Sequence, residues 1–385
     1  MPPQPFSIAI PDADLDRLRD RIRSTRWADD WDNGDWHYGV EREWLRSMAF
    51  YWANDFDWRA QESGINRWPQ FTTDIDGYRI HFLHVKGKGP DPRPLVLTHG
   101  WPWTFWDWKD VIGPLTDPAA HGGDPALSFD LVIPSLPGFA FSTPLRQKVN
   151  VRIIGRLWTG LMRDVLGYDR FMAAGGDWGA LVTAELGHAH ADHVDAVHLA
   201  MPMLPGLDQF NMSPDDFAPD EQWMPQRQAE SWPLIASHVT VQSNDPQTLA
   251  YALADSPVGT AAWLWERRHA WSDNGGDIFK SFDRDFLCTT ASLYWLTNSI
   301  GSSLRIYKDH FGAADPWPLL HDGKIISVPT GFAIAPKELI FLPRKIAEER
   351  TNLHRWTILP SGGHFSGAEN PAALVDEYRA LARAL

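Results

Sequence analysis

The chain has 385 residues, of which 44% are hydrophobic and 22% are charged, and its formal net charge is -14 at pH 7. Nucleic acids and anionic membrane surfaces attract basic patches, so this acidic balance excludes both as expected partners. The single cysteine, Cys288, excludes an internal disulfide and a zinc site built on paired cysteines, and it favours a cytoplasmic location.

The hydropathy pattern favours a soluble globular protein. No apolar run approaches the roughly 18 to 20 residues that a membrane-spanning helix needs. Residues 1–10 lack the basic start and the apolar stretch of a signal peptide. The 21 tryptophans are unusually many, and we expect most of them to pack in the core and a minority to line an apolar pocket.

The N-terminal part of the chain predicts helices followed by a hairpin. Apolar residues recur three and four positions apart over residues 11–24, and residues 40–51 predict a second helix. Alternating apolar and polar residues then predict a β-hairpin from residues 71–75 and 78–85. We therefore assign residues 1–90 to an N-terminal arm that leads into the first strands.

The rest of the chain alternates between strand and helix patterns. Short apolar runs that end in Gly or Pro turns predict parallel strands at residues 94–98, 131–133, 171–174, 324–333 and 355–359. Helical patterns separate these runs. We therefore predict an α/β fold, with a mostly parallel sheet flanked by helices, an inserted helical lid and the N-terminal arm.

This prediction divides the remaining chain into three parts. The first half of the core covers residues 91–201, the helical lid covers 202–303, and the second half of the core covers 304–385. The lid segment is mainly helical with Pro, Gly and Asp breaks, and it interrupts the strand pattern. A lid inserted between two halves of one sheet explains that interruption.

Gly-Gly-Asp-Trp-Gly at residues 175–179 lies between a predicted strand and a predicted helix and has the form of a nucleophile elbow. Small residues permit a strained turn that presents one side chain, here Asp177, at the carboxyl edge of the sheet. When an aspartate opens an epoxide or displaces a halide it forms an ester, which water can hydrolyse, whereas a serine would form an ether. Taken alone, the turn also fits an aspartate that caps the following helix.

An oxyanion hole is expected beside this turn. His-Gly-Trp-Pro at residues 99–102 directly follows a predicted strand, at the place where a hydrolase needs a backbone N–H group for its oxyanion. We expect Trp101 to supply that group. The N–H group of Trp178, directly after Asp177, is expected to be the second donor.

The remaining catalytic groups come from the C-terminal part of the chain. His364, in Gly-Gly-His-Phe, follows the last predicted strand and is the expected general base. Glu338 comes after the preceding strand and can orient His364, with Asp315 as an alternative acid. The order Asp177, Glu338, His364 is the order of nucleophile, acid and histidine that the α/β-hydrolase fold requires.

With these motifs the chain resembles the microsomal epoxide hydrolase family, which includes the juvenile hormone epoxide hydrolases and bacterial relatives. The likeness covers almost the whole chain. Its most specific pieces are the Trp-rich segment through Trp58 and Trp68 and the motifs at 99–102, 134–139, 175–179, 256–259, 293–295, 328–332 and 362–365. The resemblance implies that Asp177 is the nucleophile, His364 the base and Glu338 the acid.

The resemblance also implies two lid tyrosines that hydrogen-bond the epoxide oxygen. One of them matches Tyr307. Counting back from the motif at 256–259 places the other on His238. Two alternatives follow: His238 donates an N–H in place of the missing phenol, or it faces solvent and a water or Tyr251 takes the second position. We expect a soluble relative without the N-terminal membrane anchor of the mammalian members.

We therefore expect an enzyme that converts an apolar or aromatic epoxide and water into a vicinal diol through an ester on Asp177, without a metal or organic cofactor. A haloalkane dehalogenase with a similar Asp-Trp elbow is the nearest competitor, and Tyr307 and the Trp-rich arm favour the epoxide. A catalytically silent ligand-binding protein of the same fold is the third reading, which the full Asp, Glu and His set disfavours. A homodimer is expected from the frequency of dimers among soluble proteins.

Overall fold

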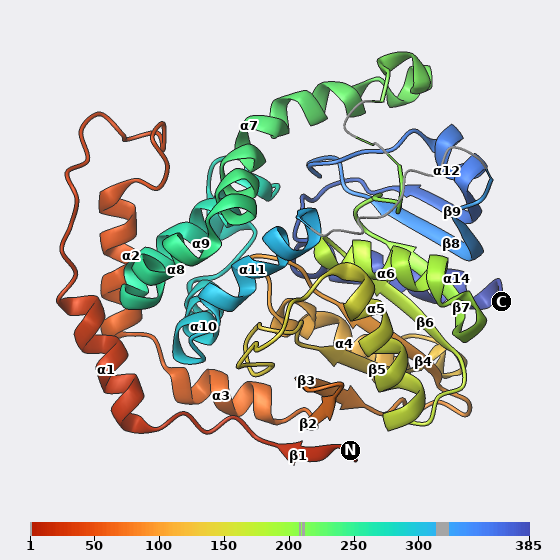
Figure 1. Ribbon diagram of the computed structural model, residues 1–385, viewed down its shortest axis with the longest axis horizontal. Helices are drawn as coiled ribbons and strands as arrows, with labels where there is room; N and C mark the ends of the chain where they lie inside the picture. Colours follow the sequence, from red (N-terminus) through yellow and green to blue (C-terminus); the bar gives the residue numbers. More distant parts are fainter. Residues whose placement is uncertain (1, 208, 210–211, 313–322) are drawn as a thin grey trace.

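The computed structural model describes residues 2–207, 209, 212–312 and 323–385. The described chain contains a sheet in the order β1-β2-β3-β5-β4-β6-β7-β8-β9 (Figure 1). Pairing is antiparallel from β1 to β5 and parallel from there to β9. The strands are β1 (Gln4–Phe6), β2 (Gln70–Ile75), β3 (Tyr78–Val85), β4 (Arg93–Thr98), β5 (Phe129–Pro134), β6 (Phe171–Gly175), β7 (Val194–Leu199), β8 (Ile326–Ile334) and β9 (Thr351–Ile358).

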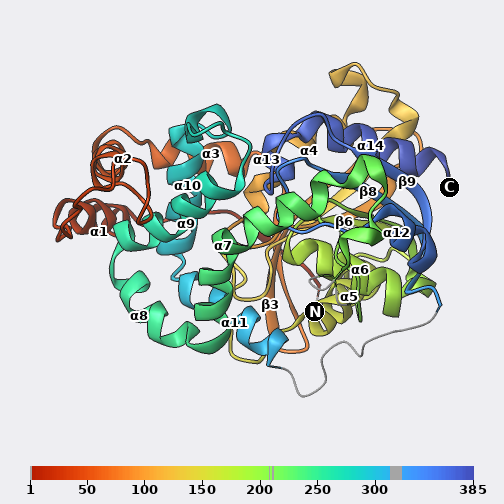
Figure 2. The ribbon, with the colours of Figure 1, turned by 90° about the horizontal axis from the view of Figure 1, so that it is seen from above.

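Helices cover both faces of this sheet. In Figure 2, α4, α13 and α14 lie over one face, and α5 and α6 lie on the other. Every residue of β5 and β6 is buried, as expected for strands covered on both sides. The core helices are α4 (Lys109–Thr116), α5 (Val151–Gly160), α6 (Trp178–Ala189), α12 (Arg344–Arg350), α13 (Ser366–Glu369) and α14 (Pro371–Arg383). The predicted α/β-hydrolase fold is confirmed.

A helical lid follows β7 and precedes β8. Its helices are α7 (Trp223–Asn244), α8 (Pro246–Asp255), α9 (Pro257–Trp271), α10 (Arg284–Leu296) and α11 (Ile300–Phe311). The boundary predicted between residues 303 and 304 falls inside α11, because the buried face of this helix continues through Leu304, Ile306 and Tyr307. Tyr307 is therefore on a lid helix and not in the second half of the core.

The N-terminal arm packs on the side of the lid that faces away from the sheet (Figure 1). Its helices are α1 (Asp12–Arg23), α2 (Arg42–Asn54) and α3 (Trp58–Asn66). Trp52 shows how the contact is made: its ring lies 5.8 Å from that of Trp265 on α9, and its Nε1–H donates to Ser292 of α10 at 2.9 Å. The arm thus supports the lid, and several of its tryptophans serve packing, as expected.

Two strands were missed in the sequence. β1 has three residues, one of them a proline, so it carries almost no pattern. β7 contains Asp195 and His198, which interrupt its apolar run, although His198 is fully buried in the structure. The predicted helices and the hairpin in the arm, and the strands corresponding to β4, β5, β6, β8 and β9, are confirmed.

Candidate active site

Asp177 occupies a strained turn between β6 and α6. Its φ of 52° and ψ of -129° form a backbone conformation that L residues rarely adopt. The turn also passes close to the strand before it. A Cβ on Gly179 would lie 2.0 Å from the carbonyl oxygen of Thr98, so only glycine fits there. Within the described residues the Asp177 side chain makes no capping hydrogen bond to α6, which removes the helix-cap alternative.

The loop after β4 places a backbone donor on this carboxylate. The N–H of Trp101 donates to Asp177 Oδ1 at 2.7 Å. The loop is fixed by His99, whose Nδ1 pairs with the carbonyl oxygen of Gly100 at 2.9 Å and whose Nε2 accepts the Leu136 N–H at 3.1 Å. Burial lowers the pKa of His99 to about 4, so the ring is neutral, as an imidazole that donates once and accepts once must be.

Trp178 is the first residue of α6. The first N–H groups of a helix lack a partner within the helix, so they are available to an oxyanion. Its role as the second oxyanion donor stays a prediction.

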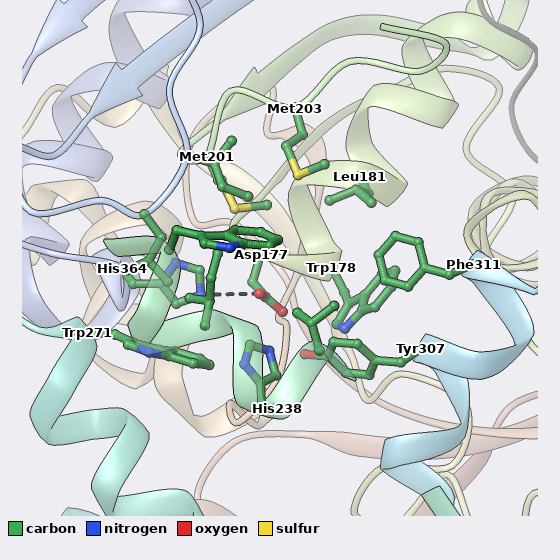
Figure 3. Close-up of a pocket in the computed structure, with 15 residues that line it drawn as sticks. Asp177, Trp178, Leu181, Met201, Met203, His238, Trp271, Tyr307, Phe311 and His364 are labelled. Carbon is green, nitrogen blue, oxygen red and sulfur yellow. Dashed lines mark hydrogen bonds and ion pairs between the residues drawn. The ribbon is translucent and has the colours of Figure 1, made fainter. Parts of the chain in front are cut away.

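His364 joins the other two predicted catalytic residues. Its Nδ1 lies 2.7 Å from Glu338 Oε1, and its Nε2 lies 3.2 Å from Asp177 Oδ2, the contact drawn as a dashed line in Figure 3. Glu338 Oε1 also accepts the N–H of Leu339 at 2.7 Å, which fixes the acid. Asp315, the alternative acid, lies outside the described residues.

The charge on His364 follows from this arrangement. Burial opposes the charged form, but Glu338 and Asp177 outweigh it and raise the pKa of His364 to about 10. The ring is therefore an imidazolium at neutral pH, with one N–H directed at each carboxylate. An imidazolium cannot accept a proton, so His364 must lose its proton before it can act as a base.

Two lid side chains complete the site opposite Asp177. Tyr307 on α11 and His238 on α7 are both buried, with ring centroids 5.4 Å apart, and both face the carboxylate across the cavity (Figure 3). His238 stacks on the Trp101 ring at 5.3 Å and 11°, and Tyr307 meets the Trp178 ring edge-on at 4.8 Å. Tyr251 is 73% exposed on α8, so it does not take the second position.

The protonation states of His238 and Tyr307 follow mainly from their burial. Burial, and then the charge of Arg267, lower the pKa of His238 well below its usual value of 6.5. Burial, and then the charge of Asp177, raise the pKa of Tyr307 well above 10. Both groups are therefore neutral over the ordinary pH range. A neutral His238 still carries one ring N–H, so it can donate a hydrogen bond in this state.

These side chains enclose an apolar cavity of about 150 Å³. Its polar groups are those of the catalytic residues, and the rest of the wall is hydrophobic. The apolar lining consists of Leu181, Met201, Met203, Trp232, Ile235, Val239, Trp271, Phe311, Leu339 and Ile340. The minority of tryptophans expected in a pocket are Trp178, Trp232 and Trp271.

Sequence reasoning missed part of this lining. Met201 and Met203 come directly after β7, and the carboxyl ends of parallel strands are where α/β sheets bind ligands. Had β7 been recognised, its position would have identified both residues. No sequence signal relates them to Ile235 or Val239 on α7.

A buried ion pair joins the lid to the core behind the site. Arg268 of α9 donates to Asp107 Oδ1 at 2.6 Å and to the carbonyl oxygen of Pro102 at 3.1 Å, in the loop that carries Trp101. Its guanidinium also lies 4.1 Å from the centre of the Phe365 ring, next to His364. Arg268 thus ties the lid to both catalytic loops.

Comparison with known proteins agrees with this geometry. The family model described as epoxide hydrolase N terminus matches residues 3–108, and the alpha/beta hydrolase fold model matches residues 93–371. The chain is 38% identical over 384 residues to a Stigmatella aurantiaca protein named as an epoxide hydrolase, covering 99% of this chain and 85% of that one. It is 32% identical over 403 residues to epoxide hydrolase 1 of Oryctolagus cuniculus, covering 96% of this chain and 86% of the relative.

The solved structures agree with the relatives. The structure of Aspergillus niger epoxide hydrolase superposes with a TM-score of 0.86 at 30% identity, over 100% of this chain and 97% of that one. None of the helices in the described ranges is long and apolar enough to cross a membrane.

Proposed function

The chain belongs to the epoxide hydrolase family, and we propose that it converts a small apolar or aromatic epoxide into a vicinal diol through an ester on Asp177. One observation carries this proposal. A continuous line of hydrogen bonds runs from Trp101 through Asp177 and His364 to Glu338, on one side of an apolar cavity that faces Tyr307. A catalytically silent pocket would need none of these bonds.

The first step is attack on the epoxide. Oδ1 of Asp177 is held by the Trp101 N–H, and Oδ2, which receives the longer 3.2 Å contact from His364, forms the bond to a ring carbon as the ring C–O bond breaks. Negative charge then grows on the released oxygen. Tyr307, kept protonated by burial, supplies a proton to it, which leaves an alcohol and a tyrosinate.

Ester formation changes the charge on His364. The ester is neutral, so one of the two carboxylates that raise the pKa of His364 is gone. The imidazolium can then return a proton to the tyrosinate through solvent and become a neutral base. Alkylation of Asp177 therefore activates the group that the second step needs.

The second step is hydrolysis of the ester. His364, oriented by Glu338, removes a proton from water as the water oxygen attacks Cγ of Asp177. The oxyanion forms at Oδ1, where Trp101 already donates, with Trp178 as the proposed second donor. As the tetrahedral intermediate collapses, the proton of its new hydroxyl passes to the departing alkoxide. This gives the diol and the carboxylate, and the proton first taken from water remains on His364.

The cavity limits the substrate. An engineered apolar protein cavity of about 150 Å³ binds benzene, so a cavity of this volume suits a one-ring or short aliphatic epoxide. A Tyr307 that delivers a proton suits an epoxide better than a halide, since a departing halide needs hydrogen-bond donors but no proton. We retain the cytoplasm and a homodimer as proposals, which fractionation of cells and light scattering test.

A single turnover in oxygen-18 water tests the ester. Water attacks the carboxyl carbon in the proposed mechanism, so the label enters Asp177 and the first diol contains unlabelled oxygen from the protein. In His364→Gln, the ester accumulates because alkylation needs only the carboxylate, and mass spectrometry detects it. Label found directly in the first diol would overturn the proposal, because water would then attack the ring.

A further inference from the structure

Glu369, the last residue of α13, directs its carboxylate at the loop that carries His364. Oε1 accepts the N–H of Gly363 at 3.1 Å, and Oε2 accepts the N–H of Phe365 at 2.9 Å. Gly363 and Phe365 are the residues directly before and after His364. One carboxylate therefore holds both flanks of the proposed base.

The same carboxylate also reaches the lid. Oε1 accepts the N–H of Asp273, just after α9, at 2.7 Å. The His364 loop makes two further hydrogen bonds to this segment. The His364 N–H donates to the Trp271 carbonyl oxygen at 2.9 Å, and the Gly362 N–H donates to Asp273 Oδ2 at 3.0 Å. Four successive N–H groups, from Gly362 to Phe365, are thus held by Glu369 or by residues 271–273.

This loop is closely packed against the residues after α9, so losing one of its hydrogen bonds would displace its backbone. A Cβ on Gly363 would lie 2.5 Å from the Trp271 carbonyl oxygen, so the backbones pass at close range. The two bonds made by the His364 ring, to Glu338 and Asp177, are directional and depend on where this backbone lies. A shift of about 1 Å in a catalytic group can cost about 100-fold in rate.

Burial raises the pKa of Glu369 to about 7, but its three backbone N–H donors favour the ionised form, in which both oxygens accept. Glutamine has the same shape but only one acceptor oxygen, so its NH₂ group would face one of the three backbone donors. A buried N–H left without a partner is unfavourable, and the loop would move to find one. Substitution by glutamine therefore removes bonds while it preserves volume.

We propose that Glu369 is a positioning residue, which holds the His364 ring in line with Glu338 and Asp177 for hydrolysis of the ester. This inference rests on the proposed function, because it assigns Glu369 to one of the two half-reactions. Alkylation uses the Asp177 carboxylate and Tyr307, neither of which Glu369 touches. Its loss should therefore act on the second step and spare the first.

The test is single-turnover kinetics of Glu369→Gln with styrene oxide, with alkylation and ester hydrolysis followed separately by mass spectrometry of the quenched protein. We expect alkylation within about 3-fold of the unsubstituted protein, hydrolysis slowed by about 10- to 100-fold, and accumulation of the ester. The downfield proton resonance of the His364 Nδ1–H should also move as its bond to Glu338 weakens.

Glu377 is the matched control. Its carboxylate is buried and lies against Arg355, Thr357 and His198, and within the described residues it makes no hydrogen bond to the His364 loop. Glu377→Gln should lower stability while leaving the ratio of the two half-reaction rates unchanged. Glu369→Asp is the second variant, for use if Glu369→Gln fails to fold. It keeps the carboxylate but is one methylene shorter, so it should show the same hydrolysis defect.

The outcomes separate the two proposals. If the unsubstituted protein makes diol without an ester on Asp177, the proposed function fails. If it forms the ester and either Glu369 variant hydrolyses it at the normal rate, or slows both half-reactions equally as a general loss of structure would, the positioning inference is wrong.

Discussion

The core half of the site and the lid half are held in different ways. In the core half, hydrogen bonds of 2.7 to 3.2 Å join Trp101, Asp177, His364 and Glu338, and charge strengthens them. In the lid half, Tyr307 and His238 are placed by contacts between aromatic rings.

This difference separates two tasks. The core half is arranged before any substrate arrives, as the preorganised donors of a catalytic centre should be. In the lid half, the polar groups of the buried His238 and Tyr307 face a cavity whose other walls are mainly apolar. Buried polar groups are favoured when they have hydrogen-bond partners, so the lid half gains from an epoxide oxygen that accepts from them. We therefore propose that the core half carries the ester and its hydrolysis, and that the lid half assists ring opening.

Removing the nucleophile should have the largest effect. Asp177→Asn replaces the attacking carboxylate by an amide, and we expect diol formation to fall by at least about 10⁴-fold. Asp195→Asn, at an ion pair with Arg170 on the surface, is the control and should keep full activity. Turnover of Asp177→Asn at more than about one hundredth of the normal rate would mean that another group attacks.

The same variant tests the charge on His364. Because the Asp177 carboxylate helps to raise the pKa of His364 to about 10, its loss should lower that pKa, which titration by NMR measures. A histidine with a raised pKa adds stability that is complete below about 6.5 and is lost as the pH rises through about 10. Asp177→Asn should therefore show a weaker loss of stability between these pH values.

Breaking the ion pair between Arg268 of the lid and Asp107 of the core should have the next largest effect. Arg268→Met leaves Asp107 buried without its counter-charge, and we expect the free energy of unfolding to fall by about 3 to 5 kcal/mol in urea denaturation. Arg344→Met removes an exposed ion pair with Glu348 and should cost less than about 1 kcal/mol. Equal losses in the two variants would show that the lid does not depend on this ion pair.

The two halves also differ in how far the sequence predicts them. Asp177 and His364 lie on glycine-rich turns directly after strands, where local geometry restricts the residue types, so motif and chain order identify them. His238 was located only by counting residues through the lid helices. Its pKa is lowered by burial and by the charge of Arg267, and both depend on the tertiary structure. The partners Arg268 and Asp107 are 161 positions apart, and no local pattern relates them.

Tyr307→Phe tests whether the lid half of the site acts on alkylation and not on ester hydrolysis. The ring and its contact with Trp178 remain, and only the hydroxyl that we propose as the proton donor to the epoxide oxygen is lost. We expect alkylation to slow by about 100-fold and ester hydrolysis to stay within about 3-fold, measured in single turnovers. Tyr251→Phe, on the exposed face of α8, should change neither rate. A hydrolysis defect as large as the alkylation defect would contradict the division of tasks.

His238→Phe should have the smallest effect. Phenylalanine can still stack on Trp101, but it cannot donate an N–H, so we expect alkylation to slow by about 10-fold with ester hydrolysis unchanged. His238→Tyr supplies a phenol instead and should recover most of the rate. Normal alkylation by the Phe variant would remove His238 from the site and leave Tyr307 as the sole donor.

The pH profile decides which form of His238 acts. Because the pKa of His238 lies well below 6.5, the ring is neutral on both sides of that value, and the alkylation rate should stay flat between pH 6 and pH 8. A fall in rate through pH 6.5 that disappears in His238→Tyr would mean that the charged form acts after all. The lowered pKa of His238 also affects the stability of the fold. Below about pH 6.5 the unfolded chain binds a proton at this histidine that the folded protein does not, so the free energy of unfolding should fall further as the pH falls. His238→Phe should remove this contribution.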